Sequence, residues 1–349
     1  MARSAERGVG RLPAKSGARG LLAAISLGIA VGSAPAQAAA DKAAMLFPGS
    51  INDQSWNADG YAGLMQIKAL GFDIAYSENV DAADHVDAMR DYAHQGFKLI
   101  IGHSGRFLTA AQQVGPESPD TQFIVAAGSR GFGGNVLSID FNNRHFGCLL
   151  GTLAAAMSRT GKIGGVYGLE GLPTTIDQVG SFRICAKQAR PDIQVGVLYI
   201  ADLESAAAAK EAAFSLIASG ADVLSGQLNA GQQGLIQAAK EKNVFVTGRS
   251  YGQTAIAPAN VLTNVIEQWP QMYAAAAADV TAGKLSGGLK IYGLDTPASP
   301  GASLSYAPNE AYNKAVPASV VAAIGAVQAR LADGTLKIEP TGEDARGGE

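Results

Sequence analysis

The chain alternates short apolar runs with longer helix-like stretches, and this alternation constrains its fold more than any other feature. The first apolar run, Ala43–Phe47, is closed by the turn residues Pro48 and Gly49, as is typical of a buried parallel strand. Further strands are predicted near 73–76, 98–101, 122–126, 162–166, 194–200, 222–225, 244–247, 261–265 and 289–293. Helices are predicted near 56–70, 83–95, 107–115, 144–158, 174–189, 204–219, 231–241, 271–282 and 310–332. The alternation predicts an α/β fold of βαβ units, with parallel sheets covered by helices on both faces.

The composition allows a buried core and excludes several classes of protein. Of the 349 residues, 47% are hydrophobic and 16% are charged, too little charge for a disordered chain or a coiled coil. The net charge of -3 does not support a basic face, so no nucleic-acid partner is expected. The four histidines and two cysteines have no spacing typical of a metal site, and we expect neither a metal nor a cofactor.

The first 38 residues have the pattern of a secretory signal peptide. A basic segment precedes the apolar run Leu21–Val31, and Ala34–Ala38 supplies small residues suited to cleavage after Ala38. A disordered or membrane-anchoring N-terminus is the alternative. No cysteine stands near the cleavage point to carry a lipid, so we expect an exported, periplasmic protein. The mature chain would keep 22 basic and 29 acidic side chains, a net charge of -7.

Export would place Cys148 and Cys185 in an oxidising compartment, where a disulfide can persist. Both cysteines lie in apolar segments that are predicted to be helical, so two buried thiols are the alternative. The sequence does not supply the Cα separation that decides between the two.

Two segments that lie 124 residues apart resemble each other, namely Gly96–Gly102 and Gly220–Gly226. Each follows an amphipathic helix and leads through a short polar loop into another helix. Two similar α/β halves, each of about 120 residues, explain this repeat better than one large sheet.

The segments after residue 260 are too few for a third core, so we expect them to complete the two halves. Crossings between the halves are expected near 140–144, 262–268 and 293–300. The N-terminal lobe is predicted to comprise residues 41–142 plus about 265–295. The C-terminal lobe is predicted to comprise residues 143–264 plus about 296–335, and residues 339–349 are predicted to be a disordered tail.

Motifs for catalysis are incomplete. Gly102–Gly105 follows a predicted strand as a hydrolase nucleophile elbow does, but Arg106 replaces the last glycine of G-x-S-x-G. The glycine-rich segment Gly165–Gly171 lacks the spacing of a dinucleotide fingerprint, and the sequence has no phosphate loop. We therefore expect a protein that is not an enzyme, and a secreted serine hydrolase that uses Ser104 is the alternative.

Small and polar residues gather in the loops that follow four predicted strands. Ligands of open α/β sheets bind beyond the carboxyl ends of the strands, so two facing lobes would bring these loops to one cleft. Trp56 offers a flat apolar surface beside the donors and acceptors of Asp53 and Asn57, which suits a planar polar ligand. The alternative is that Trp56 anchors the core and Asp53 caps a helix. The four loops are Gly49–Asn57, Gly102–Gly105, Gln227–Gly231 and Gly248–Gln253.

The first of these loops carries a family resemblance. Asn52–Asn57, followed by Gly60–Leu64, is similar to the D-K-S-F-N…G…G-L opening of the basic membrane protein family. Those proteins are substrate-binding proteins of ABC importers and are related to purine nucleoside receptors. The resemblance implies a type I periplasmic-binding fold, in which two Rossmann-like lobes with parallel sheets are joined by a three-crossing hinge and close on a ligand. Further matches, in order from about residue 43 to 295, are Gly96–Gly102, Thr160–Gly164, Gly220–Val223, Ala238–Lys242, Ala257–Thr263 and Tyr292–Leu294.

The chain departs from the family pattern at two positions that bear on the ligand. Ser250 stands where the resemblance implies a carboxylate that binds ribose hydroxyls, and Glu267 stands where it implies a basic residue. Loss of that carboxylate removes hydrogen bonds of roughly 1.5–3 kcal/mol each. A purine base or related heterocycle is therefore favoured over an intact nucleoside. Arg249 either supplies new donors or is a solvated loop residue.

The loops and the resemblance together define the expected site, which has no catalytic residue. Trp56 is expected to stack on the ligand ring, opposed by Tyr167 or Tyr251, while polar side chains bond the ring edge and its substituents. The expected partners are the small-molecule ligand, a purine-like heterocycle, and an ABC permease with its ATPase, and the chain is expected to be a monomer. A ligand-sensing partner of a membrane receptor is a further alternative. The expected ligand-binding residues are Asp53, Trp56, Asn57, Ser104, Tyr167, Asn229, Ser250 and Tyr251.

Overall fold

The structure is a computed structural model that describes residues 40–128, 130–249, 252–295 and 301–348. The expected signal peptide, residues 1–38, lies outside these ranges, and so do Ser250 and Tyr251. Among the helices within these ranges, none is long and apolar enough to span a bilayer.

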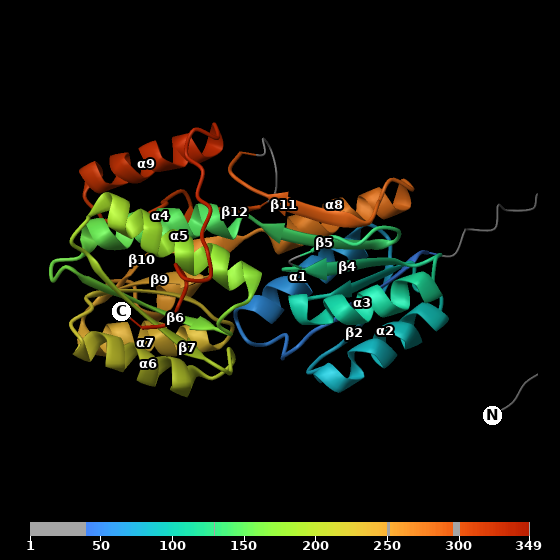
Figure 1. Cartoon of the computed structure of the whole chain (residues 1–349). Helices are drawn as coiled ribbons and strands as arrows, with labels where there is room; N and C mark the ends of the chain where they lie inside the picture. The colour runs from blue at the N-terminus through green and yellow to red at the C-terminus, as the bar shows by residue number, and fades with distance from the viewer. Residues whose placement is uncertain (1–39, 129, 250–251, 296–300, 349) are drawn as a thin grey trace, which may run out of the picture. The chain divides into compact units, whose positions relative to one another are not determined.

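The described residues form two sheets, and the first is parallel throughout (Figure 1). Its strand order is β11-β5-β4-β3-β1-β2, so the carboxyl ends of these strands lie at one edge. The late strand β11 pairs with β5, which brings a C-terminal segment into the N-terminal half. The strands are β1 (Lys42–Leu46), β2 (Asp73–Ser77), β3 (Leu99–Gly102), β4 (Gln122–Ala126), β5 (Val136–Phe141) and β11 (Gly288–Tyr292).

Two pairs of helices cover the two faces of this sheet. Ala43, Met45 and Phe47 belong to the same core cluster as residues of α1 and α8, whereas Ala44 and Leu46 belong to a cluster with α2 and α3. Successive side chains of a strand point to opposite faces, so a run that is apolar at every position requires helices on both. These helices are α1 (Trp56–Ala69), α2 (His85–His94), α3 (Leu108–Val114) and α8 (Trp269–Thr281).

The second sheet repeats this plan with one antiparallel edge strand. Its order is β12-β10-β9-β8-β6-β7, and β12 runs antiparallel to β10. The strands are β6 (Lys162–Gly168), β7 (Gln194–Ile200), β8 (Val223–Gln227), β9 (Phe245–Arg249), β10 (Val261–Glu267) and β12 (Ala302–Ser305).

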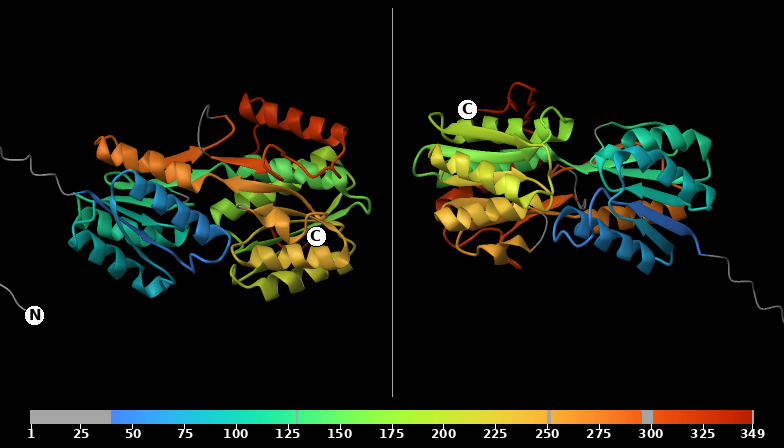
Figure 2. Two further views of the ribbon diagram at one scale, coloured as in Figure 1. Left: turned by 180° about the vertical axis from the view of Figure 1, so that it is seen from behind. Right: turned by 90° about the horizontal axis from the view of Figure 1, so that it is seen from below.

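Helices also cover both faces of the second sheet, as the two further views of Figure 2 show. The pair α6 and α7 packs on one face, α4 and α5 pack on the other, and α9 packs against α4. The helices are α4 (Asn143–Met157), α5 (Pro173–Ala189), α6 (Ala206–Ala218), α7 (Gly231–Lys242) and α9 (Ala318–Ala332). Short 3₁₀ turns are η1 (Ala82–Asp84), η2 (Gly105–Phe107), η3 (Gly115–Glu117) and η4 (Gln253–Ile256).

The chain passes between the two halves three times. The passages lie between β5 and α4, between β10 and α8, and between β11 and β12. The third passage includes residues 296–300, which are outside the described ranges. The connectivity is that of two Rossmann-like lobes joined by three crossings, as the sequence predicts.

Two strands and one helix boundary differ from the sequence-based prediction. The pattern does not predict β5 or β12, because polar residues interrupt the apolar run of β5 and β12 is a short polar edge strand. The last helix begins at Ala318 rather than at residue 310. Pro317 at its N-cap disfavours a helical conformation in the residue before it, which explains the later start.

The C-terminal tail was expected to be disordered, and the structure contradicts this for residues 339–348. Arg183 donates to the backbone carbonyls of Arg346 (2.7 Å) and Gly348 (2.6 Å). Gly348 forms an antiparallel bridge with Val197 of β7, which is the last strand at that edge of the sheet. The guanidinium group and the strand edge supply the hydrogen bonds that this polar segment could not make by itself.

Close packing of α4 against α5 brings the two cysteines together. A Cβ atom on Gly147 would lie 2.3 Å from the Gln178 carbonyl oxygen, and one on Gly151 would lie 2.1 Å from that of Phe182. The absence of these side chains lets the helix backbones touch. The Cα atoms of Cys148 and Cys185 are 5.0 Å apart and the pair forms a disulfide, which decides between the alternatives that the sequence leaves open.

Replacement of both cysteines by alanine is expected to lower the free energy of unfolding by about 3–4 kcal/mol, because the bridge closes a loop of 37 residues in the unfolded chain. Urea denaturation of the wild type and the double variant measures this loss. A reductant should destabilise the wild type by a similar amount and leave the double variant unchanged. Equal sensitivity of both proteins to the reductant would contradict the bridge.

Candidate functional site

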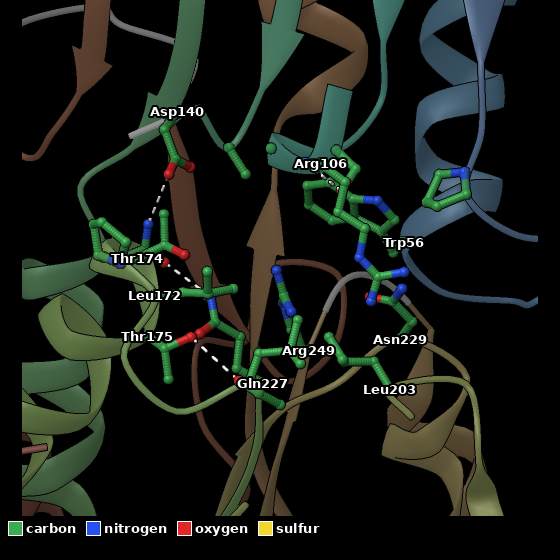
Figure 3. Close-up of a pocket in the computed structure, with 18 of the residues that line it drawn as sticks. Trp56, Arg106, Asp140, Leu172, Thr174, Thr175, Leu203, Gln227, Asn229 and Arg249 are labelled. Atoms are coloured by element: carbon green, nitrogen blue, oxygen red, sulfur yellow. Dashed lines mark hydrogen bonds between the residues drawn. The ribbon is translucent and has the colours of Figure 1, made fainter. Parts of the chain in front are cut away.

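A cavity of about 220 Å³ lies beside the carboxyl ends of strands from both sheets (Figure 3). From the first sheet, residues that follow β3 and β4 and the end of β5 line it. From the second sheet, residues at or beyond the ends of β6, β8 and β9 line it. Parallel strands place these loops at one edge of each sheet, which is where the sequence analysis expects the cleft. The lining includes Trp56, Ser104, Asp140, Gln227, Asn229 and Arg249.

Trp56 both lines the cavity and anchors the core. Only 5% of its surface is exposed, and its indole N–H donates to the His103 carbonyl (2.9 Å). The His103 ring stacks on the indole with ring centroids 4.3 Å apart, and the Trp269 ring meets it edge-on at 5.0 Å. The Arg249 guanidinium carbon lies 5.4 Å from the centroid of the indole ring. The core role and the cavity role, which the sequence analysis treats as alternatives, are thus combined in one side chain.

His103 is a structural residue in this arrangement. Its Nε2 donates to the Trp56 carbonyl (2.8 Å), which requires Nδ1 to accept from the Tyr273 hydroxyl (2.6 Å) when the ring is neutral. Burial lowers the pKa of His103 to about 3, so the ring is neutral near pH 7. Both ring nitrogens are engaged, and Ser104 Oγ accepts from the Arg106 backbone N–H (3.3 Å). His103 therefore does not activate Ser104 as a nucleophile.

Arg249 lines the cavity and is not the solvated loop residue that the sequence analysis holds as one alternative. It is 7% exposed, and its Nε donates to Glu267 Oε1 in a buried ion pair. The other oxygen of Glu267 accepts from Trp269 Nε1 (2.6 Å). The sequence contains a signal for this pair, because Glu267 stands where the family resemblance implies a basic residue and the same chain carries Arg249.

The ion pair predicts a double-variant result. Arg249→Met is expected to lower the free energy of unfolding by about 3–5 kcal/mol, because it leaves Glu267 buried without its cation. The double variant Arg249→Met with Glu267→Gln should lose less free energy of unfolding than Arg249→Met alone, because no buried charge then remains without a partner. Urea denaturation of the wild type, both single variants and the pair measures the coupling. A double variant that loses the sum of the two single losses would show that the two groups are independent.

Asp53 and Asn57 bind each other at the start of α1 and are not among the residues that line the cavity. The Asp53 carboxylate accepts from the backbone N–H groups of Ser55, Asn57 and Ala58, each at 2.9 Å, and from Asn57 Nδ2 at 3.0 Å. These bonds satisfy N–H groups at the start of α1, which have no partner inside the helix. Asn57 is fully buried. The structure therefore gives Asp53 the capping role that the sequence analysis holds as the alternative.

Asp59 is a buried carboxyl group behind this cap. Its Oδ2 has no hydrogen-bond partner among the described residues. Burial, followed by the negative charge of Glu267, raises the pKa of Asp59 to about 8. The carboxyl group thus holds its proton in the folded protein at a pH where an exposed aspartate has lost it.

This shift predicts how stability depends on pH. The folded pKa lies above the unfolded one, so the contribution of Asp59 is fully present below about pH 4 and is lost as pH rises to about 8. The free energy of unfolding of Asp59→Asn should therefore increase relative to the wild type between pH 5 and pH 8, as urea denaturation would measure. Asp120→Asn, which changes an exposed aspartate, is the control. Identical pH slopes for the wild type and Asp59→Asn would refute the assignment.

The remaining expected site residues fall into three groups. Ser104 and Asn229 line the cavity, and Asn229 Nδ2 donates to Glu204. Tyr167 does not line it: its side chain is fully buried in the core beneath α4 and α5, because strand alternation in β6 points it to that face. Ser250 and Tyr251 lie outside the described residues.

Asp140, Asn143 and Gln227 form a hydrogen-bonded chain along one wall of the cavity (Figure 3). Asn143 Nδ2 donates to Asp140 Oδ2 at 3.0 Å, and Gln227 Nε2 donates to Asn143 Oδ1 at 3.0 Å. Asp140 belongs to β5 and Gln227 to β8, so the chain links the two sheets. The sequence analysis misses Asp140 and Asn143 because it does not predict β5.

Comparison with known proteins identifies the family. The model of the Bmp family, described as ABC transporter substrate-binding protein PnrA-like, matches residues 40–298. The chain belongs to this family. The expected family and the expected periplasmic-binding fold are thereby confirmed, and proteins of this family are solute-binding proteins rather than enzymes.

Individual proteins show the same relationship. This Bmp-family chain is 28% identical to the transcriptional activator protein med of Bacillus subtilis, over 76% of this chain and 83% of that protein. It is 26% identical to the ABC transporter nucleoside-binding protein BmpA of Lactococcus lactis, over 50% of this chain and 51% of that protein. An ABC transporter solute-binding protein from Conexibacter woesei is similar in structure, with a TM-score of 0.68, 26% identity, and coverage of 86% of this chain and 99% of that one.

Proposed function

We propose that this Bmp-family protein delivers a small, planar, polar and uncharged solute to an ABC importer, with a purine base favoured over a nucleoside. The observation that carries the proposal is the cavity, which lies between polar side chains of both sheets and the Trp56–Arg249 wall. The exported protein would act in the periplasm as a monomer, with an ABC permease and its ATPase as partners.

The size of the cavity supports a small ligand. Pockets for drug-sized molecules have volumes of about 300–1,000 Å³, whereas this cavity has about 220 Å³. Trp56 and the Arg249 guanidinium supply flat groups against which a ring can stack. A single planar ring system fits this combination better than a flexible chain or an oligosaccharide.

The electrostatics of the cavity support an uncharged ligand. The charge of Arg249 is compensated by Glu267, and burial raises the pKa of Asp140 well above its ordinary value, which favours the uncharged form of this carboxyl group. Arg106 also lines the cavity but is exposed, so water screens its charge. Hydrogen bonding, rather than ion pairing, is therefore the main polar contact that the cavity offers.

The proposed ligand-binding residues combine predicted and observed positions. Ser104, Asn229 and Trp56 stay in the set because they line the cavity, and Arg249 joins them. Ser250 and Tyr251 stay as proposals from the sequence. The name of the Lactococcus lactis relative, a nucleoside-binding protein, supports a ligand that contains a nucleobase.

The test is thermal unfolding of the exported protein after it has been denatured and refolded to remove bound solutes. A ligand at 100 times its dissociation constant should stabilise the folded state by about 2.7 kcal/mol. Purine bases are expected to raise the midpoint, and ribose and amino acids are not. Trp56→Ala should abolish the shift, whereas Tyr76→Ala, which changes a half-exposed aromatic of β2, should keep it. Shifts with sugars or amino acids alone would overturn the proposed ligand class.

Two other functions make different predictions in the same experiments. A serine hydrolase would release product from esters and lose that activity in Ser104→Ala. A ligand sensor would bind the same solute without supporting its uptake, and the name of the Bacillus subtilis relative makes this comparison worthwhile. Uptake of labelled solute is measured in cells that lack the protein and in the same cells after the protein is expressed again. A transport protein restores uptake, whereas a sensor does not.

A further inference from the structure

The wall formed by Asp140, Asn143 and Gln227 offers a specific set of hydrogen-bonding atoms. Both N–H donors of Asn143 are used, since its Nδ2 donates to Asp140 Oδ2 (3.0 Å) and to the Phe141 carbonyl (3.2 Å), and its Oδ1 accepts from Gln227 Nε2 (3.0 Å). Asn143 is also 4% exposed. It therefore positions its two neighbours and does not itself contact a ligand.

Asp140 keeps hydrogen-bonding capacity toward the cavity. Its carboxyl group accepts from the Phe141 backbone N–H (2.8 Å) and from Asn143 Nδ2, which uses two of about four acceptor positions. Burial, with the nearby charge of Glu267, raises the pKa of Asp140 well above its ordinary value. In its protonated form, which this shift favours, the carboxyl group presents one O–H donor beside one acceptor.

Gln227 adds a second acceptor to the same wall. Its Nε2 is held by Asn143, so its amide orientation is determined and its Oε1 remains for other contacts. Figure 3 shows Asp140 and Gln227 on the same side of the cavity, away from Trp56. A ring that stacks near Trp56 would therefore present an edge to these two residues.

We propose that Asp140 and Gln227 determine the specificity of the cavity by bonding the amide edge of an uncharged ring, meaning a ring N–H next to a carbonyl, with Asn143 as the positioning residue. An O–H donor beside an acceptor is complementary to such an edge and forms two hydrogen bonds with it. The inference rests on the proposed function, since it names the solute class for the same cavity.

Discrimination should be strong because Asp140 and Asn143 of this wall are buried. A buried site that is built to hydrogen-bond one group rejects an analogue that leaves its polar atoms without partners. Hypoxanthine carries an uncharged amide edge, and 1-methylhypoxanthine has a methyl group in place of the ring N–H. Adenine lacks the carbonyl. Orotate carries a carboxylate, which should bind weakly because the charge of Arg249 is already paired with Glu267.

The experiment is isothermal titration of the full exported protein with these four compounds. Hypoxanthine is expected to bind, and 1-methylhypoxanthine to bind roughly 10- to 100-fold more weakly. Asp140→Ala should weaken hypoxanthine binding by a similar factor, whereas Asp140→Asn should keep it, because an amide also presents a donor beside an acceptor. Asp177→Ala, which removes a half-buried carboxylate that pairs with Arg144 on α4, is the matched control.

Asn143→Ala separates positioning from stability. It should weaken hypoxanthine binding and leave the weaker binding of adenine unchanged, an effect that a purely structural role would not produce.

Equal affinities for hypoxanthine and 1-methylhypoxanthine in the wild type would overturn the inference without any variant. Tighter binding of orotate, or loss of binding in Asp140→Asn, would assign a charged contact instead. If a purine binds but Asp140→Ala does not weaken it, this inference fails and the proposed function stands; if no ring compound binds, both fail.

Discussion

The buried ion pair between Arg249 and Glu267 governs the electrostatics of the cavity and its surroundings. It ties the end of β9 to the end of β10, and through Trp269 it reaches the first turn of α8. The negative charge of Glu267 also contributes to the raised pKa values of Asp59 and Asp140. Burial is the main cause of both raised pKa values, and within the ion pair Glu267 raises them while Arg249 lowers them.

The aromatic cluster beneath the cavity depends on the same arrangement. Arg249 lies over one part of the Trp56 indole, His103 stacks on it, and Tyr273 holds the His103 ring. Gly60 and Gly63 on α1 make room for His103 and Tyr273, because a Cβ at either glycine would lie within 2.6 Å of one of those rings. The first helix, the third strand and α8 are therefore packed around one buried polar and aromatic core, which gives the ligand wall a rigid support.

Most of the fold could be predicted from the sequence because the signals are local. Apolar runs of five or so residues and the helices between them follow from periodicity, and every predicted strand is present. The missed strand β5 contains Ser138 and Asp140, whose polarity hides the strand pattern. The candidate site was predicted less well: Trp56, Ser104 and Asn229 line the cavity, but Tyr167 points into the core and Asp53 caps α1.

The sequence by itself determined the class of fold, the family, and the loops that surround the cleft, because each depends on short patterns of residues along the chain. Only the tertiary structure decided which side chains in and near those loops face the cavity. The pairing of Arg249 with Glu267 joins two consecutive strands, and the link from Asp140 through Asn143 to Gln227 joins strands of the two sheets that are far apart in the sequence. The disulfide likewise depends on two glycines that let α4 and α5 approach. Contacts of this kind depend on distances between segments far apart in the chain, which no local pattern specifies.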